Sequence, residues 1–235
     1  LVERLFGGLA ATPAPAPRKA IPVPVRGVRR TEIADRVSAP RITFAWVTAP
    51  AFSDDDVALT VASQVLTEGV TSRLYDRLVA RDGLATDVTS FQSSLKYGSV
   101  FRLQADLAPG KSRTALERAM AEELARFPDR PLAVAEIDRA KALVVADVLR
   151  AASSLLGAAD VVQQIEFSTG DPNGFAKEVA RIRAVTPERV RAAARRWLRP
   201  DRRLNLWEVP GEPTPLPGPG VVSPKGEPPV ERPAA

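Results

Sequence analysis

The sequence predicts an α+β fold in which helices pack on one face of a mostly antiparallel sheet. Three observations support this prediction. Segments 41–48 and 99–107 alternate apolar and polar residues, as half-buried strands do. The turn Lys96-Tyr97-Gly98 joins the second of them to a Thr- and Val-rich segment at 85–95, as in a β-hairpin. Apolar residues at helical spacing recur between residues 112 and 198.

The alternation also predicts which strand residues share a face. In segment 41–48, Ile42, Phe44 and Trp46 lie on one side of the strand. In segment 99–107 the corresponding set is Phe101, Leu103, Ala105 and Leu107. A last strand is predicted at 203–209, where the apolar residues are Leu204, Leu206 and Trp207.

Helix starts and stops are marked by capping residues. Ser53 is predicted to cap a helix whose first turn holds Asp54, Asp55 and Asp56, because carboxylates favour a helix N-terminus. A shorter helix begins at Ser72 or Thr71 and ends at Gly83, a left-handed C-cap. Further helices are predicted at 112–127, 133–151 and 154–167, and after Asp171-Pro172 and Thr186-Pro187, which each combine an N-cap residue with proline.

Proline marks the predicted domain boundaries. Of 22 prolines, five lie in residues 13–24 and nine in 210–233. We therefore expect residues 1–24 to be the end of a preceding domain plus a Pro-rich linker, and 25–209 to be the folded unit. Residues 210–235 are expected to form a Pro/Gly-rich tail or interdomain linker.

Composition excludes several kinds of site. The chain has no histidine and no cysteine, which excludes disulfides, cysteine nucleophiles, thiolate metal sites and a Ser-His-Asp triad within it. No apolar run approaches the ~18–20 residues of a membrane span. The formal charge of +5 is modest for 235 residues and does not by itself indicate nucleic-acid binding.

Two charged clusters are open to more than one interpretation. Asp54, Asp55 and Asp56 could bind a metal, but their place at a helix start favours a dipole role. Residues 181–203 hold nine arginines against Glu188 and Asp201, which could grip nucleic-acid phosphates. The run lacks interleaved aromatic residues, so a solvated or interdomain face is favoured.

Three segments together resemble the pitrilysin/insulinase-type zinc metallopeptidases, which include the mitochondrial processing peptidases. Residues 66–85, Leu-Thr-Glu-Gly-Val-Thr-Ser-Arg-Leu-Tyr-Asp-Arg-Leu-Val-Ala-Arg-Asp-Gly-Leu-Ala, are similar to the family's Gly-x-x-Ser-Arg-Leu-aromatic segment. Residues 135–141 are similar to its Glu-Ile-x-x-Ala-Lys helix, and 182–190 to its Ile-x-x-Val-Thr-x-Glu-x-Val helix start. The order and spacing of the three also fit, over roughly residues 30–209.

The resemblance implies a processing-peptidase-like domain in a tandem arrangement. The family binds zinc on a His-x-x-Glu-His helix of one domain, which pairs with a sister domain of the same fold. This sequence lacks that motif, so it matches a non-catalytic domain with no cofactor of its own and zinc in a partner domain. The implied partners are a sister domain, in the same chain or a partner subunit, and a peptide substrate. Family analogy favours an extracytoplasmic, for example periplasmic, location, and a cytoplasmic one also fits.

The family often supplies a substrate-binding arginine and tyrosine from a non-catalytic domain. Here these positions are Val79 and Thr86, which cannot replace a guanidinium and a phenol. If the sheet lines a chamber with its helices outward, the expected wall contacts are Phe91, Gln92, Phe101 and Leu103.

Three functions remain open on the sequence alone. The chain could form part of the peptide chamber of a zinc-dependent endopeptidase-like protein, being no enzyme by itself. It could be a purely structural or assembly subunit, which the missing arginine and tyrosine favour. Nucleic-acid binding through the Arg-rich helix is the weakest alternative.

Overall fold

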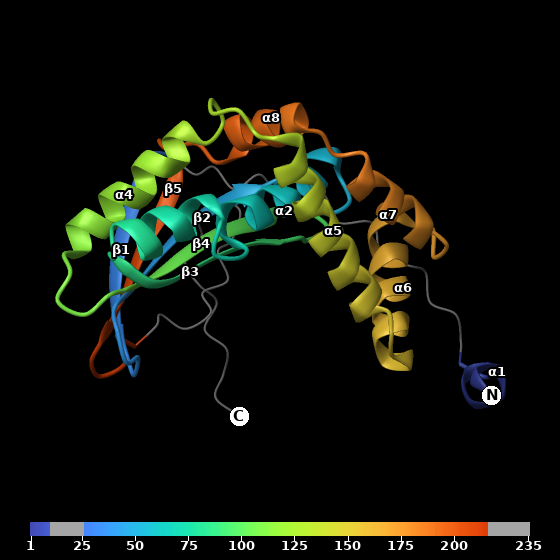
Figure 1. Ribbon diagram of the computed structural model, residues 1–235. Coiled ribbons are helices and arrows are strands. Elements are labelled where there is room, and N and C mark those ends of the chain that lie inside the picture. Colours follow the sequence, from blue (N-terminus) through green and yellow to red (C-terminus); the bar gives the residue numbers. More distant parts are fainter. Residues whose placement is uncertain (10–25, 216–235) are drawn as a thin grey trace.

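A five-stranded sheet with the strand order β1-β5-β2-β4-β3 organises the fold, and its long helices lie on one side (Figure 1). The computed structural model describes residues 1–9 and 26–215. The elements are α1 Val2–Phe6, β1 Val28–Asp35, β2 Arg41–Thr48, α2 Asp54–Thr67, α3 Arg73–Tyr75, the π-helix η1 Asp76–Arg81, β3 Ala85–Ser93, β4 Ser99–Leu107, α4 Arg113–Arg126, α5 Val134–Ala151, α6 Leu155–Thr169, α7 Phe175–Arg183, α8 Pro187–Trp197 and β5 Arg203–Pro210. The α+β prediction is confirmed. All strand pairs are antiparallel except β1 with β5.

The two sides of the sheet differ because the strand side chains alternate. Phe44 on β2 pairs with Leu103 on β4, and both are completely buried under the helices. Within each strand, the predicted shared face of apolar residues is confirmed. Trp46 and Phe101 lie beside them on the same side, in edge-to-face contact at 6.1 Å. We call this the covered face and the opposite side the open face. The open face is formed by the alternate residues Arg41, Thr43, Ala45 and Val47 of β2, Val100, Arg102, Gln104 and Asp106 of β4, Thr89 and Phe91 of β3, and Leu204, Leu206 and Glu208 of β5.

Helix α2 is the centre of the core. It begins where predicted, with the Ser53 side chain accepting a hydrogen bond from the Asp56 amide. Its buried residues pack on β3, α5 and α8, which hold the helical layer to the sheet. These contacts make one continuous apolar core on the covered face.

The short helix after Ser72 has an irregular backbone. It begins as α3 and continues as the π-helix η1, ending before Gly83, which has the left-handed φ of 57° expected of a glycine C-cap. Arg73 forms two hydrogen bonds of 2.9 Å to Glu136 at the start of α5. Arg77 bonds Glu122 at 2.8 Å and the buried Glu123 at 3.4 Å on α4. The arginines therefore fasten this segment to its neighbours.

Strand β1 is an addition to the predicted elements. Its sequence, Val28-Arg-Arg-Thr-Glu-Ile-Ala-Asp35, is too polar to show an alternating apolar pattern. It pairs with β5 at the edge of the sheet, and Arg30 and Glu32 meet Glu117 and Arg113 of α4. Ion pairs with a helix thus take the place of apolar burial.

Two local predictions need adjustment. The prediction that Asp171-Pro172 starts a helix is wrong: Asp171 accepts a 3.0 Å hydrogen bond from the Asn173 amide in a turn, and α7 begins at Phe175. In β5 the strand is confirmed, but the side chains on its covered face are Arg203, Asn205 and Trp207. By contrast, the Thr186-Pro187 start of α8 is confirmed, with Thr186 accepting from the Arg189 amide.

Parts of both predicted linkers, residues 10–25 and 216–235, lie outside the described residues. Residues 211–214 are described and return to β1. There the Gly211 amide donates to the Asp35 carbonyl at 3.0 Å and Thr214 exchanges hydrogen bonds with Ala34.

Candidate functional site

The four residues expected to line a chamber do not share a face. Phe91 lies on the open face with 37% of its surface exposed, beneath the Arg102 guanidinium at 5.5 Å. Phe101 and Leu103 are completely buried on the covered face, so the expectation that they line an open wall is wrong. Gln92 also points to the covered side, where it bonds Asp56 and Thr48. Strand alternation causes this split, because neighbours such as Phe91 and Gln92 must face opposite ways.

The open face combines apolar groups with polar groups that bond each other. Val47 and Phe91 are both 37% exposed on it. Arg41 forms a bidentate ion pair with Asp106, with N–O distances of 2.6 and 3.0 Å. This pairing, with burial opposing it, raises the pKa of Arg41. A surface of this kind offers apolar contact without a strong excess of either charge.

The positions of the family's arginine and tyrosine both lie in irregular backbone. Val79 is in the π-helix η1 and packs against the core. Thr86 is the extra residue of a β-bulge, since Ala85 pairs with Leu107 and Asp87 with Asp106. Irregularities of both kinds are frequent at functional sites, but these two side chains offer neither a cation nor a phenol.

The three aspartates at the start of α2 diverge instead of forming a metal site. Asp54 pairs with Arg181 and Arg189, and Asp55 accepts from the indole of Trp197 at 2.8 Å. Asp56 turns inward and is 5% exposed. Within residues 1–9 and 26–215 no group of three or more acidic residues is placed to hold a metal ion. The helix-dipole interpretation is the one that this geometry supports.

The arginine run around α8 is largely neutralised by nearby acids. Arg195 pairs with Asp129, Arg196 with Asp55, and Arg199 with Asp201. The guanidinium of Arg203 is buried against the Phe44 ring at 4.3 Å, and this burial lowers its pKa. These arginines hold the fold together, and their charge is only partly available to a phosphate backbone.

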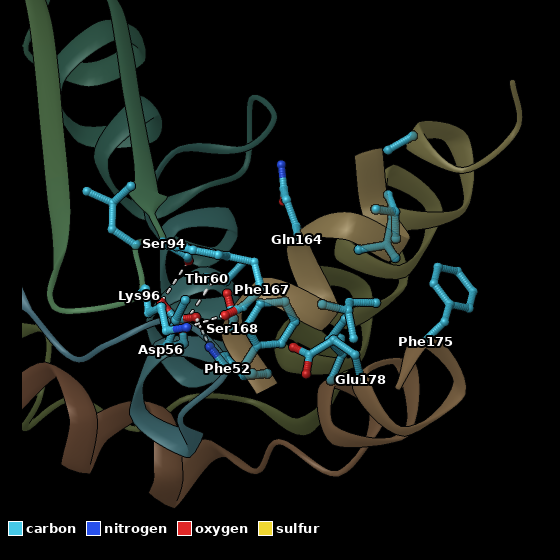
Figure 2. A pocket seen from close by; sticks show the side chains of 18 of the residues that line it. Phe52, Asp56, Thr60, Ser94, Lys96, Gln164, Phe167, Ser168, Phe175 and Glu178 are labelled. Carbon is cyan, nitrogen blue, oxygen red and sulfur yellow. Dashed lines mark hydrogen bonds between the residues drawn. The ribbon is translucent and has the colours of Figure 1, made fainter. Parts of the chain in front are cut away.

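The best-formed cavity lies on the covered side, at the end of the sheet where the β3–β4 hairpin meets α2, α5, α6 and α7. It has a volume of about 460 Å³ and is lined mainly by apolar side chains. Figure 2 shows Asp56 and Glu178 near Phe167 in it. Sequence reasoning did not find this site, because its walls come from segments up to 131 residues apart, from Ala51 to Ile182.

Asp56 is held by a dense set of donors. Its Oδ1 accepts from Gln92 at 2.8 Å and Ser94 at 2.7 Å, and its Oδ2 accepts from the Phe52 amide at 3.1 Å. Phe52 has the left-handed φ of 61°, a conformation that costs energy in a non-glycine residue and here aims its amide at the carboxylate. Burial nonetheless raises the pKa of Asp56, against the effect of these hydrogen bonds.

Glu178 on α7 is the second acid of the cavity. Its Oε2 pairs with Arg181 at 3.1 Å, and its side chain is 18% exposed. Burial raises the pKa of Glu178, the repulsion from Asp56 adds to the rise, and Arg181 opposes it. Perturbed carboxyl groups in an apolar cavity are typical of binding sites.

Within residues 1–9 and 26–215, no single helix has the length and apolar composition to cross a bilayer. One pair of helices, α5 and α6, passes the same test when taken together, and the two are bent by 113°.

Comparison with known proteins finds a matching family model and solved structures with the same fold. Residues 1–144 match the model of the Peptidase M16 inactive domain. No curated protein matches the chain. A protease from Helicobacter pylori has the same fold, with 21% identity and a TM-score of 0.72 over 88% of this chain and 51% of that one. The chain therefore spans about half the length of that protease.

Two further structures show the same fold at other lengths. An inactive peptidase domain from Bordetella parapertussis is 23% identical, with a TM-score of 0.68 over 78% of this chain and 97% of that one. A chain of complex III2 from Candida albicans is 13% identical, with a TM-score of 0.67 over 77% of this chain and 45% of that one. Identities this low show the fold, and the family model adds the family: the chain belongs to the inactive domains of the M16 peptidases.

Proposed function

We propose that this chain is the non-catalytic domain of a zinc metallopeptidase-family protein. It packs against a catalytic sister domain of the same fold, and its open face forms part of the wall of a peptide-holding chamber. The observation that carries the proposal is the open face itself: a five-stranded sheet surface with Val47 and Phe91 exposed, opposite the long helices, in an inactive-domain family member.

The chemistry of the open face suits a peptide. Exposed apolar groups give contact area, while Arg41 with Asp106 and Gln104 with Thr43 are already paired within the surface. Such a wall would hold chains of varied sequence through its apolar groups. Arg102 and Glu208 also lie on this face and form no ion pair among the described residues, so they could contact charged groups of the peptide.

Zinc would be held by the sister domain. The sequence has no histidine or cysteine, and the described residues contain no acidic group of three placed for a metal. This chain therefore fits the role of positioning a peptide near a metal site and does not fit the role of binding the metal.

A structural or assembly subunit is the second candidate. Val79 and Thr86 leave the family's substrate-gripping positions without a guanidinium or a phenol, and the fold is shared with a chain of complex III2. On this alternative the open face would contact another subunit instead of a peptide.

Peptide cleavage by the full-length protein separates the two. We expect cleavage that a chelator abolishes, and a Val47→Asp/Phe91→Asp variant with kcat/KM reduced about tenfold, because two apolar contacts would become charged. The matched control is Val134→Asp, at a position 66% exposed on α5, which should leave kcat/KM unchanged. A folded full-length protein that cleaves nothing, with or without added zinc, would favour the structural subunit.

A further inference from the structure

The 460 Å³ cavity has no part in the proposed chamber wall. It lies on the covered side of the sheet, whereas the open face is on the other side. Its size is within the range of small-molecule sites, about 300–1,000 Å³. The cavity therefore raises a separate question, namely which chemistry it would accept.

The walls require an apolar body. Val144 and Val148 of α5, Ile165 and Phe167 of α6, and Ile182 of α7 all line the cavity. Phe167 is itself 57% exposed, so part of this wall is still open to solvent. An aromatic ring or a short aliphatic chain entering here would remove apolar surface on both partners from water.

The polar groups of the cavity favour a cation over an anion. Both oxygens of Asp56 already accept hydrogen bonds, Oδ1 from Gln92 and Ser94 and Oδ2 from the Phe52 amide. In Glu178 only Oε2 has a partner among the described residues, the Arg181 guanidinium. The Oε1 atom of Glu178 therefore keeps its capacity to accept a hydrogen bond at the cavity wall.

Neither Lys96 nor Arg181 forms a hydrogen bond to the Oε1 atom of Glu178. The Lys96 ammonium donates to the Phe167 carbonyl and lies 4.3 Å from the centre of the Phe167 ring. The Arg181 guanidinium forms ion pairs with both Glu178 and Asp54. An ammonium group bound beside Glu178 would also weaken the repulsion between Glu178 and Asp56. A bound carboxylate would instead add a further negative charge and increase that repulsion.

We propose that this cavity binds an apolar primary amine, whose ammonium donates to Glu178 while its ring or alkyl chain packs between Val144, Val148 and Ile165. The pairing of the ammonium charge with the half-buried Glu178 carboxylate gives selectivity for an amine over an alcohol of the same shape. Neutral or anionic analogues would keep the apolar contact and lose the charge pair.

Phenethylamine and 2-phenylethanol test the proposal, because they differ only in the polar group. Binding to the whole 235-residue chain at pH 7.5 would be measured by titration of amide chemical shifts. We expect the amine to bind at least about tenfold more tightly than the alcohol, with shifts centred on α5, α6 and α7. Equal affinity for the two probes, or no saturable shifts with the amine, would overturn the assignment.

Three variants locate the effect. Glu178→Gln should reduce the affinity for the amine to that for the alcohol. Glu166→Gln, at an exposed position on α6, is the control and should leave the affinities for both probes unchanged. Val148→Phe should exclude both probes by filling the cavity; its circular dichroism spectrum checks that the variant folds. An amine preference that remains in Glu178→Gln would contradict the proposal. This result is independent of whether the open face forms a chamber wall.

Discussion

Glu117 on α4 accepts a 2.7 Å hydrogen bond from the side-chain amide of Asn205 on β5. The same carboxylate accepts from the Trp207 indole at 3.2 Å and from Arg30 of β1 at 3.3 Å. One acid thus joins a helix to two strands at the edge of the sheet. This explains how β5 can carry buried polar side chains, since the Asn205 amide and the Trp207 indole both have an acceptor.

The pH dependence of stability should report this cluster. Burial alone would raise the pKa of Glu117, but the hydrogen bonds from Trp207, Asn205 and Arg30 outweigh it and the pKa is lowered. A lowered pKa contributes stability above the unfolded-state pKa, and that contribution is lost as the pH falls through the folded-state value. Glu117→Gln cannot contribute in this way.

We therefore expect the stability advantage of the wild type over Glu117→Gln to shrink as the pH falls from about 5 to about 3. Urea unfolding followed by tryptophan fluorescence at several pH values measures it. Glu166→Gln, exposed on α6, is the control and should follow the wild type. An advantage that stays constant over this pH range would show that Glu117 is not stabilised in its charged form.

Truncating two aromatic residues tests which face of the sheet is covered. Phe101 is completely buried, so Phe101→Ala should lower the free energy of unfolding by about 3–5 kcal/mol. Phe91 is 37% exposed on the open face, and Phe91→Ala should cost about 1 kcal/mol or less. Chemical denaturation of both variants measures the difference, and equal losses would contradict the facial assignment.

The ion pairs around the π-helix give a third prediction. Arg77 bonds Glu123, whose side chain is 2% exposed and which also pairs with Arg130 at 2.8 Å. Arg77→Ala removes one of these two cationic partners and should cost about 1–3 kcal/mol. Arg81, with a side chain 63% exposed, pairs with no acid but the exposed Asp76 among the described residues. Arg81→Ala should change stability by about 0.5 kcal/mol or less, and thermal unfolding compares the two.

Much of the fold could be predicted from the sequence because local signals agree with it. The alternation in β2 predicted that Phe44 and Trp46 share a face, and that in β4 predicted the same of Phe101 and Leu103. Ser53 marked the start of α2. These features depend on neighbours in the sequence, so the chain itself displays them.

What could not be predicted depends on contacts between distant segments. Alternation cannot say which face the helices cover, and Phe101 was therefore placed on the wrong side. Strand β1 is stabilised by Arg30 and Glu32 through acids and bases of α4, which no local pattern reveals. The cavity acids Asp56 and Glu178 come from helices far apart in the sequence.

On the proposed function, the open face contacts bound peptide beside a catalytic sister domain. The chain has no cysteine, so Phe91→Cys adds a unique thiol to it, and Leu149→Cys places one on α5, at a position 51% exposed. In the full-length protein, depleted of metal to prevent cleavage, mass spectrometry can follow alkylation of each thiol with and without a saturating peptide. We predict that peptide slows alkylation at position 91 at least about fivefold and leaves position 149 unchanged, because a bound chain excludes the reagent from the open face. Equal alkylation rates at position 91 with and without peptide would contradict the account.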